Sequence, residues 1–175
     1  MSGVAWYVAR SSGIVAYLLL SGSVVIGVLM AGSARFTWPR FAVEEVHRFL
    51  AILTGVFIVL HGGALLLDTV VPFSLAQELV PFTAGYRPFA VGLGVVAAEL
   101  TAAVGISNAL RSRLPHGVWR RVHYLTLAVW GFATLHGLLA GTDRFDPWFA
   151  GLAGMSVAAA TMALIARFSP RRLAA

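Results

Sequence analysis

The chain has 175 residues, of which 59% are hydrophobic and 11% are charged, whereas soluble domains carry about 25% charged residues. Cysteine is absent, which excludes disulfides, iron–sulfur clusters held by thiolates and covalent c-type haem attachment. The 13 basic residues are all arginine, and the formal net charge is +6. In a soluble protein that charge would suggest nucleic acid. In so apolar a chain we interpret it as membrane topology and expect no nucleic-acid partner.

Five apolar segments are long enough to cross the roughly 30 Å hydrocarbon core of a bilayer. They cover residues 11–31, 46–67, 89–110, 122–140 and 148–166. The first lacks the charged start of a signal peptide, so we interpret it as a retained helix. These segments leave no room for a separate soluble domain. We expect an all-α integral membrane protein, a single domain over residues 1–175 built as a bundle of about five transmembrane helices.

The connection at residues 69–88 is longer than a turn and predicts a short helix of its own. Ser74 and Gln77 have the Ser-x-x-Gln pattern of a capping box, and Pro72 and Pro81 bracket the segment as stops. We expect an interfacial helix that lies in the headgroup boundary or caps whatever the bundle holds.

The arginines cluster in alternate connections and thereby predict an orientation. Ten flank the first and third connections or lie in the tail: Arg35, Arg40, Arg48, Arg111, Arg113, Arg120, Arg121, Arg167, Arg171 and Arg172. Arg10, Arg87 and Arg144 fall on the other face. We expect a multi-pass protein of the cytoplasmic (inner) membrane, surrounded by lipid, with its N-terminus outside and its C-terminus in the cytoplasm.

Four of the five histidines form two spaced pairs. His61 follows His47 by fourteen residues in the second apolar segment, and His136 follows His123 by thirteen in the fourth. One span separates these segments, so they run in the same direction, and each spacing corresponds to about 20 Å along a helix. We expect His47 to face His123 near the inner interface and His61 to face His136 near the outer one.

Two imidazoles at each level, without cysteine or a buried carboxylate, would leave a bare zinc or copper ion short of ligands. Haem iron needs only axial ligands from the protein, because the porphyrin supplies four nitrogens. We therefore expect two haem b groups, with these four histidines as axial ligands to the iron. A packing role is the alternative for any one histidine, but not for all four, because ionisable residues inside a membrane are costly.

Arginines near these histidines are candidates for binding the haem propionates. Arg48 follows His47, and Arg120 and Arg121 precede His123 at the inner level, where positive-inside anchoring explains them equally well. At the outer level the candidate is Arg87.

Glycines in the same spans have two interpretations, namely clearance for haem or ordinary helix packing. They are Gly55, Gly62, Gly63, Gly131 and Gly137. On an ideal helix the thirteen-residue spacing leaves His123 and His136 about 140° apart. We therefore expect the haems to be offset or the fourth span to be distorted, with a π-bulge or bend at Gly131 as the hypothesis.

Glu99 and Trp130 each have two possible roles. Glu99, in the middle of the third span, is either protonated and hydrogen-bonded or part of a proton or substrate path. Trp130 lies between the two levels and either bridges them electronically or fills the core. His116 is expected at the surface. The other tryptophans are interpreted as interfacial anchors: Trp6, Trp38, Trp119 and Trp148.

The segments 45–62 and 119–137, with thirteen and twelve residues between their histidines, resemble the ferric reductase-like transmembrane domain. Ferric reductases, NADPH oxidases and the haem-binding membrane subunit of periplasmic methionine sulfoxide reductase systems share this domain. Residues 6–13 are also similar to the start of bacterial members, and the resemblance covers most of the chain. It implies an inner haem b on His47 and His123, an outer one on His61 and His136, and electrons arriving from a cytosolic flavin donor.

The chain departs from this family because no flavin or nicotinamide domain follows the fifth span and because many relatives have six spans. We therefore expect a separate cytosolic flavin reductase or NAD(P)H-dependent donor, and an acceptor at the outer face that is a protein, Fe(III), oxygen or quinone. The chain would be the membrane redox subunit of an oxidoreductase. Two alternatives stay open: a quinol-linked cytochrome b subunit, whose outer loop or Glu99 borders a quinone pocket, and a non-enzymatic scaffold subunit of a larger membrane complex.

Overall fold

The computed structural model describes residues 2–32, 36–69, 71–143 and 146–168, and these residues form helices and connections without a strand. Its long helices are α1 (Ser2–Met30), α2 (Arg40–Leu66), α4 (Pro88–Ala109), α5 (His116–Ala140) and α6 (Pro147–Phe168). All five are long and apolar enough to cross a membrane. The predicted all-helical class with five candidate spans is confirmed. Arg35, Arg144, Arg171 and Arg172, which entered the topology prediction, lie outside the described residues.

Three of the long helices begin well before the predicted apolar segments. α1 starts at Ser2 rather than near residue 11, α2 at Arg40 rather than near 46, and α5 at His116 rather than near 122. A segment delimited by its hydropathy leaves out the polar first turns of a helix. The helix itself can continue into the headgroup region, where its charged side chains remain solvated. α4 and α6 begin with Pro88 and Pro147, where the missing N–H has no helical partner to lose.

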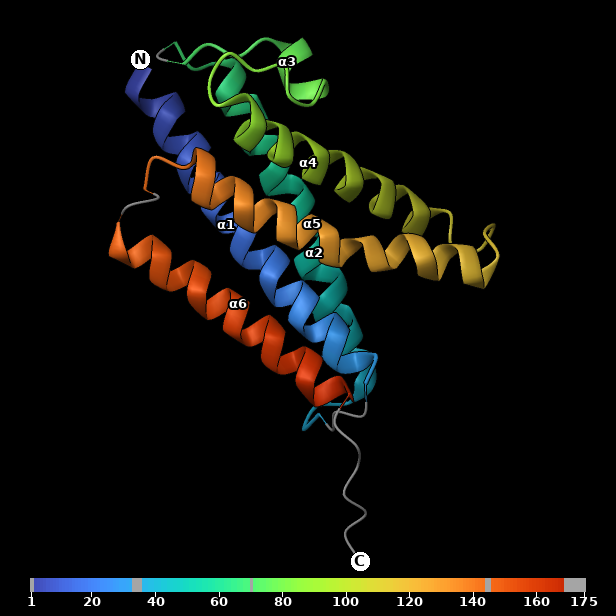
Figure 1. Ribbon diagram of the computed structural model, residues 1–175. Coiled ribbons are helices and arrows are strands. Elements are labelled where there is room, and N and C mark those ends of the chain that lie inside the picture. Colours follow the sequence, from blue (N-terminus) through green and yellow to red (C-terminus); the bar gives the residue numbers. More distant parts are fainter. Residues whose placement is uncertain (1, 33–35, 70, 144–145, 169–175) are drawn as a thin grey trace, which may run out of the picture.

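α3 (Leu75–Leu79) is the short helix predicted in the second connection. The Ser74 hydroxyl accepts from the Gln77 backbone N–H at 3.3 Å, and the Gln77 side chain accepts from the Ser74 N–H at 3.0 Å. The predicted capping box is confirmed. α3 lies at the end of the bundle where α1 begins and α2 ends (Figure 1), and we call this the α3 end.

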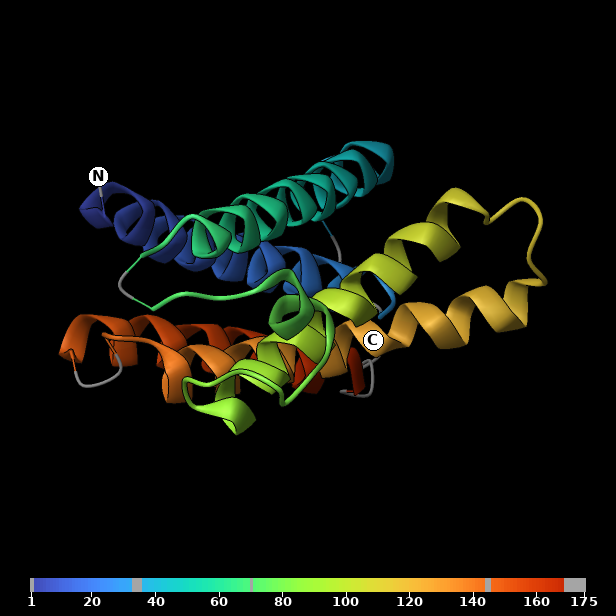
Figure 2. The ribbon, with the colours of Figure 1, turned by 90° about the horizontal axis from the view of Figure 1, so that it is seen from above.

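Two helical hairpins cross each other, and α6 completes the bundle. α1 packs against α2, α4 packs against α5, and α6 lies along α1 (Figures 1 and 2). α1 is central, because the buried core joins it to three other helices through Leu20, Val24, Val28, Ala97, Val129 and Ala163. Few contacts join α2 directly to the second hairpin. The space between α2 and the hairpin of α4 and α5 is therefore bounded mainly by side chains that extend into it.

The outward surface of α2 is strongly apolar. Phe49, Ile52, Val56 and Val59 follow one face of the helix and are 54–75% exposed. A stripe of this size would promote aggregation in water, whereas in a bilayer it contacts lipid. The surface is thus compatible with a multi-pass membrane protein.

Candidate functional site

The structure brings the four histidines of α2 and α5 together as two facing pairs. The ring centroids of His61 and His136 lie 6.3 Å apart, with an interplanar angle of 80°. Those of His47 and His123 lie 6.1 Å apart, with an angle of 68°. The two partners in each pair are those expected from the sequence.

The separation between the rings matches that of two imidazoles on opposite sides of one metal ion. If each nitrogen lies about 2.0–2.1 Å from the ion and about 1.1 Å from its ring centre, the centroids are about 6.2–6.4 Å apart. Within the described ranges, no three or more His, Asp or Glu side chains gather closely enough to hold an ion by themselves. An ion at either pair would need further ligands from outside the chain, as in haem.

Three of the four histidines are fixed by the helix that packs against them. In each case Nδ1 donates to a backbone carbonyl, and the contacts are His61 to Ala9 (2.7 Å), His47 to Ser23 (2.9 Å) and His136 to Ala90 (2.8 Å). A carbonyl oxygen can only accept, so Nδ1 carries the proton and Nε2 is left free as a ligand. Such contacts also fix the ring orientation and raise the basicity of the ligating nitrogen.

A glycine follows each of these carbonyls one helical turn later, and we call the pair of carbonyl and glycine a histidine notch. A Cβ atom at these glycines would lie close to the histidine ring, at 2.9 Å for Gly13, 3.1 Å for Gly27 and 2.6 Å for Gly94. Ordinary contacts of a Cβ begin at about 3.4 Å. Glycine therefore lets the ring approach close enough for Nδ1 to reach the carbonyl.

The glycines singled out from the sequence are not those of the notches. A Cβ at Gly55, Gly63 or Gly131 would meet no atom within 4 Å, while Gly62 and Gly137 lie against Glu78 and Phe149. A sequence signal for two of the notches did exist, because Gly13 and Gly27 are separated by the same fourteen residues as His47 and His61. When two antiparallel helices pack together, two residues on one helix can meet two residues on the other only if the spacings are similar.

His123 is held differently from the other three. Its Nδ1 is buried and has no hydrogen-bond partner in the part of the chain that the structure describes. Its ring stacks on Trp119, with centroids 5.2 Å apart and an angle of 23°. The Trp119 indole donates to Asn108 Oδ1 at 2.8 Å, so Trp119 is more than the interfacial anchor expected from the sequence.

The π-bulge proposed at Gly131 is wrong, because α5 is an uninterrupted α-helix from His116 to Ala140. The hairpin of α4 and α5 crosses α2 at an angle (Figure 1). The side of α5 that faces α2 therefore changes along its length. We attribute the meeting of His123 and His136 with α2 to this crossing rather than to a bend.

A cavity of about 650 Å³ lies beside the His61–His136 pair. This volume falls within the roughly 300–1,000 Å³ of typical ligand pockets. The cavity is largely apolar, and its lining extends from the two histidines to Thr54 and Val129 in the middle of the bundle. His47 and His123 are not part of this lining.

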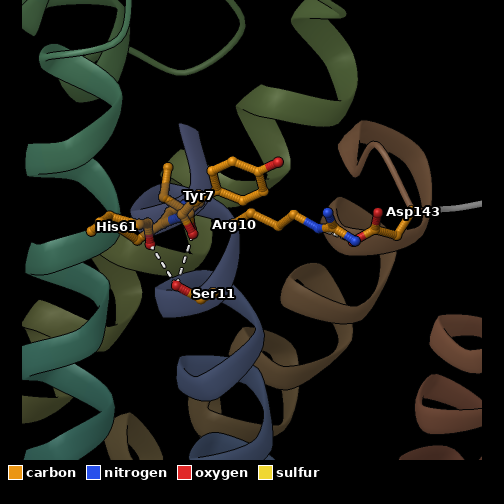
Figure 3. A network of polar contacts seen from close by, with 7 residues as sticks. Tyr7, Arg10, Ser11, His61 and Asp143 are labelled. Atoms are coloured by element: carbon orange, nitrogen blue, oxygen red, sulfur yellow. Dashed lines mark hydrogen bonds and ion pairs between the residues drawn. The ribbon is translucent and has the colours of Figure 1, made fainter. Parts of the chain in front are cut away.

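Polar groups line the cavity towards the α3 end. Arg10 Nε donates to Asp143 Oδ2 at 2.5 Å, and Figure 3 shows the Arg10 side chain reaching from α1 to Asp143 in the connection that follows α5. Its guanidinium carbon lies 5.1 Å from the ring centre of Trp6. The terminal nitrogens of Arg10 make no hydrogen bond within the described ranges. Because Arg10 lines the cavity, its guanidinium is a candidate partner for an anionic group there.

Glu78 of α3 also lines this cavity. Its Oε2 would lie 3.1 Å from a Cβ at Gly62, the neighbour of His61, and its Oε1 is buried without a hydrogen-bond partner among the described residues. Burial raises the pKa of the Glu78 carboxyl above its usual value. Sequence reasoning assigned no role to Glu78 and used Arg10 only for topology, because their proximity to His61 depends on the tertiary fold.

The arginines predicted to bind propionates lie apart from the cavity lining. Arg87 donates to the Leu139 carbonyl at 2.6 Å, and Arg48 is exposed and pairs with Glu45 at 3.6 Å. Arg121 is exposed on α5. At the His61–His136 level, Arg10 rather than Arg87 is the arginine that lines the cavity.

The residues left open by the sequence have the following places. Glu99 is exposed on α4 and does not line the cavity. Trp130 packs against the core, and its indole N–H lies within hydrogen-bond distance of Ser21 Oγ (3.2 Å) and Ser156 Oγ (3.1 Å), so it links α5 to α1 and α6. His116 is exposed, as expected.

No curated protein and no solved structure matches the chain in sequence and fold comparisons. A family model described as a domain of unknown function (DUF8596) matches residues 4–143. The match includes both histidine pairs, the three notches, Arg10 and Asp143, and it covers more than half of the chain. The chain therefore belongs to the family described as a domain of unknown function (DUF8596).

Proposed function

We propose that this protein carries electrons across a membrane through two bis-histidine haem b sites, from a cytosolic flavin-dependent donor to an acceptor at the outer face. The observation that carries the proposal is the presence of two facing histidine pairs with centroids 6.1 and 6.3 Å apart. Haem b, when bound, would supply an iron centre for one-electron transfer and four of its six ligands.

The residues of the chain would hold and orient such a group. The notches keep Nδ1 of His47, His61 and His136 protonated and direct Nε2 away from the supporting helix. At the His61–His136 pair, the apolar walls of the cavity exclude water and lower the local dielectric. Arg10 is placed to bind a carboxylate arm at the edge of that cavity.

The distribution of arginines supports the proposed direction across the membrane. Arg48, Arg111, Arg113, Arg120 and Arg121 are exposed and belong to the connections predicted to be cytoplasmic. On this proposal the α3 end would lie outside, and the His47–His123 pair would lie near the cytoplasmic face of the inner membrane. A cytosolic donor would then approach His47 and His123, and an outer acceptor would approach the α3 end.

The haem content of the purified chain tests this proposal. We expect two low-spin haems per chain in oxidised and dithionite-reduced spectra, and the loss of one haem in each of the variants His61→Ala and His123→Ala. His116→Ala is the matched control, because this histidine is exposed and belongs to neither pair. A wild-type chain that binds no haem would sink the proposal.

A quinol-linked cytochrome b is the second candidate, and Glu78 favours it. A quinol hydroxyl needs a hydrogen-bond acceptor, and Glu78 presents a buried oxygen without a partner beside the cavity. Glu99 does not line the cavity, so it would not border such a pocket. Addition of a soluble quinol analogue to the dithionite-reduced chain would shift the spectrum of the haem at His61 and His136 if this candidate is correct, and Glu78→Ala, which removes the acceptor oxygens, would abolish the shift.

A further inference from the structure

Three aromatic rings at the end of the bundle opposite α3 follow one another from the protein surface to His123, the first two tilted by 37° and the last two stacked, and we call this series the stack. His116, the first residue of α5, is exposed, and its ring centroid lies 5.6 Å from that of Trp119. Trp119 in turn lies 5.2 Å from His123. The residues are three and four positions apart, so they share one face of the helix. The stack links solvent to one of the two histidines at this level.

Trp119 is fixed on more than one side. Its indole N–H donates to Asn108 at 2.8 Å, and the guanidinium carbon of Arg111 lies 4.3 Å from its ring centre. Cation–π contact with arginine and a hydrogen bond to the indole together hold the ring against His123. These contacts account for the orientation of the Trp119 ring.

The surface around this stack is strongly basic. Arg111, Arg113, Arg120 and Arg121 are all exposed there. The sequence contains no acidic residue between Glu99 and Asp143, so nothing in this stretch of chain neutralises them. The connection of α4 to α5 lies at the free end of its hairpin, away from α6 and the start of α2 (Figures 1 and 2). A partner can therefore approach it without contacting the α3 end.

We infer that this basic surface with the stack of His116 and Trp119 docks an acidic electron-donor protein, and that Trp119 is the contact through which electrons enter. The inference rests on the proposed function, because it assumes a redox group at His47 and His123. One electron leaves the donor's redox group and is taken up at the group held by these histidines, and no bond is made or broken. Opposite charges guide the encounter, whereas the aromatic stack gives the docked donor a packed route to His123.

Anionic lipid is the other partner that such arginines can bind. The stack favours a protein donor, because lipid binding gives no reason for a tryptophan held between an arginine and His123. Arg111 shields the Trp119 ring rather than pointing away from it. The test below separates these two partners.

The test measures reduction of the full-length haem-loaded chain in nanodiscs by reduced flavodoxin, an acidic flavoprotein, in stopped-flow experiments. We expect the second-order rate to fall by about tenfold between low and high salt in the wild type, and the double variant Arg113→Gln/Arg121→Gln, which leaves the contact of Arg111 with Trp119 intact, to lose about half of this salt dependence on a logarithmic scale. Trp119→Leu should lower the limiting rate at saturating donor by about tenfold, because the packed contact to His123 is lost. Trp119→Phe, which keeps an aromatic ring, should recover most of it.

Trp38→Leu is the matched control, because Trp38 is a 64% exposed tryptophan outside this stack. It should leave both rates unchanged. The inference is overturned if Trp119→Leu and the double arginine variant are reduced by flavodoxin at the wild-type rates. It is equally overturned if the rates are unchanged and the arginine variant only binds more weakly to vesicles that contain anionic lipid, because the basic surface would then bind lipid. A wild-type chain without haem would instead refute the proposed function, and haem content and dithionite reduction are therefore measured on every variant.

Discussion

The three histidine notches predict a graded response to glycine-to-alanine substitution. A Cβ would lie 2.6 Å from the histidine ring at Gly94, 2.9 Å at Gly13 and 3.1 Å at Gly27, against about 3.4 Å for an ordinary contact. The rings must therefore retreat by about 0.8, 0.5 and 0.3 Å respectively. Gly94→Ala is expected to have the largest effect.

The hydrogen bonds translate these displacements into an energy. The contact of His136 with Ala90 would lengthen from 2.8 Å to about 3.6 Å, which is no longer a hydrogen bond, whereas the contacts of His61 and His47 would stay near 3.2 Å. Leaving a buried donor unsatisfied costs about 1–3 kcal/mol. We expect Gly94→Ala to weaken haem binding at the His61–His136 pair by about tenfold to a hundredfold.

Haem titration of the apo chain in detergent, with circular dichroism as a check on folding, measures this effect. Gly105→Ala is the matched control, because Gly105 lies on the same helix and a Cβ there would meet no atom within 4 Å. Alanine favours a helix over glycine by about 0.5–1 kcal/mol, so helix propensity predicts the opposite sign. If Gly94→Ala binds haem as the wild type does, or if Gly105→Ala is equally impaired, the glycine at position 94 is not what lets His136 reach the Ala90 carbonyl.

Three further variants test other parts of the site. Arg10→Gln should lower the midpoint potential of the group held by His61 and His136, because a nearby positive charge favours the reduced form, while Arg87→Gln should not; spectroelectrochemistry measures both. Burial raises the pKa of Glu78, so the folded state binds its proton more tightly than the unfolded state does. Stability should therefore fall as the pH rises from the unfolded-state pKa through the raised one, and thermal unfolding of Glu78→Gln in detergent should lack this fall. Ser74→Ala removes one half of the capping box, which is typically worth about 1 kcal/mol, and should speed hydrogen exchange at the Gln77 amide without changing the haem spectrum.

The sequence was sufficient for the features that depend on local pattern. Hydropathy over about twenty residues marks a span wherever it lies in the fold, so the five helices and the capped α3 could be predicted. The facing of His61 with His136 followed from their similar depths on two helices that run in the same direction. Helix starts were missed, because polar first turns do not register as apolar segments.

What holds the histidines was decided only by the tertiary structure. Ala9 and His61 are 52 residues apart, and no local pattern shows that a carbonyl of α1 will meet an imidazole of α2. The same holds for Arg10, which lines the cavity, and for Glu99, which faces outwards. The crossing of the hairpins also replaced the expected bend at Gly131, because the angle between helices is set by packing. The sequence determined which residues are available at each depth, and the contacts between distant helices decided which of them meet.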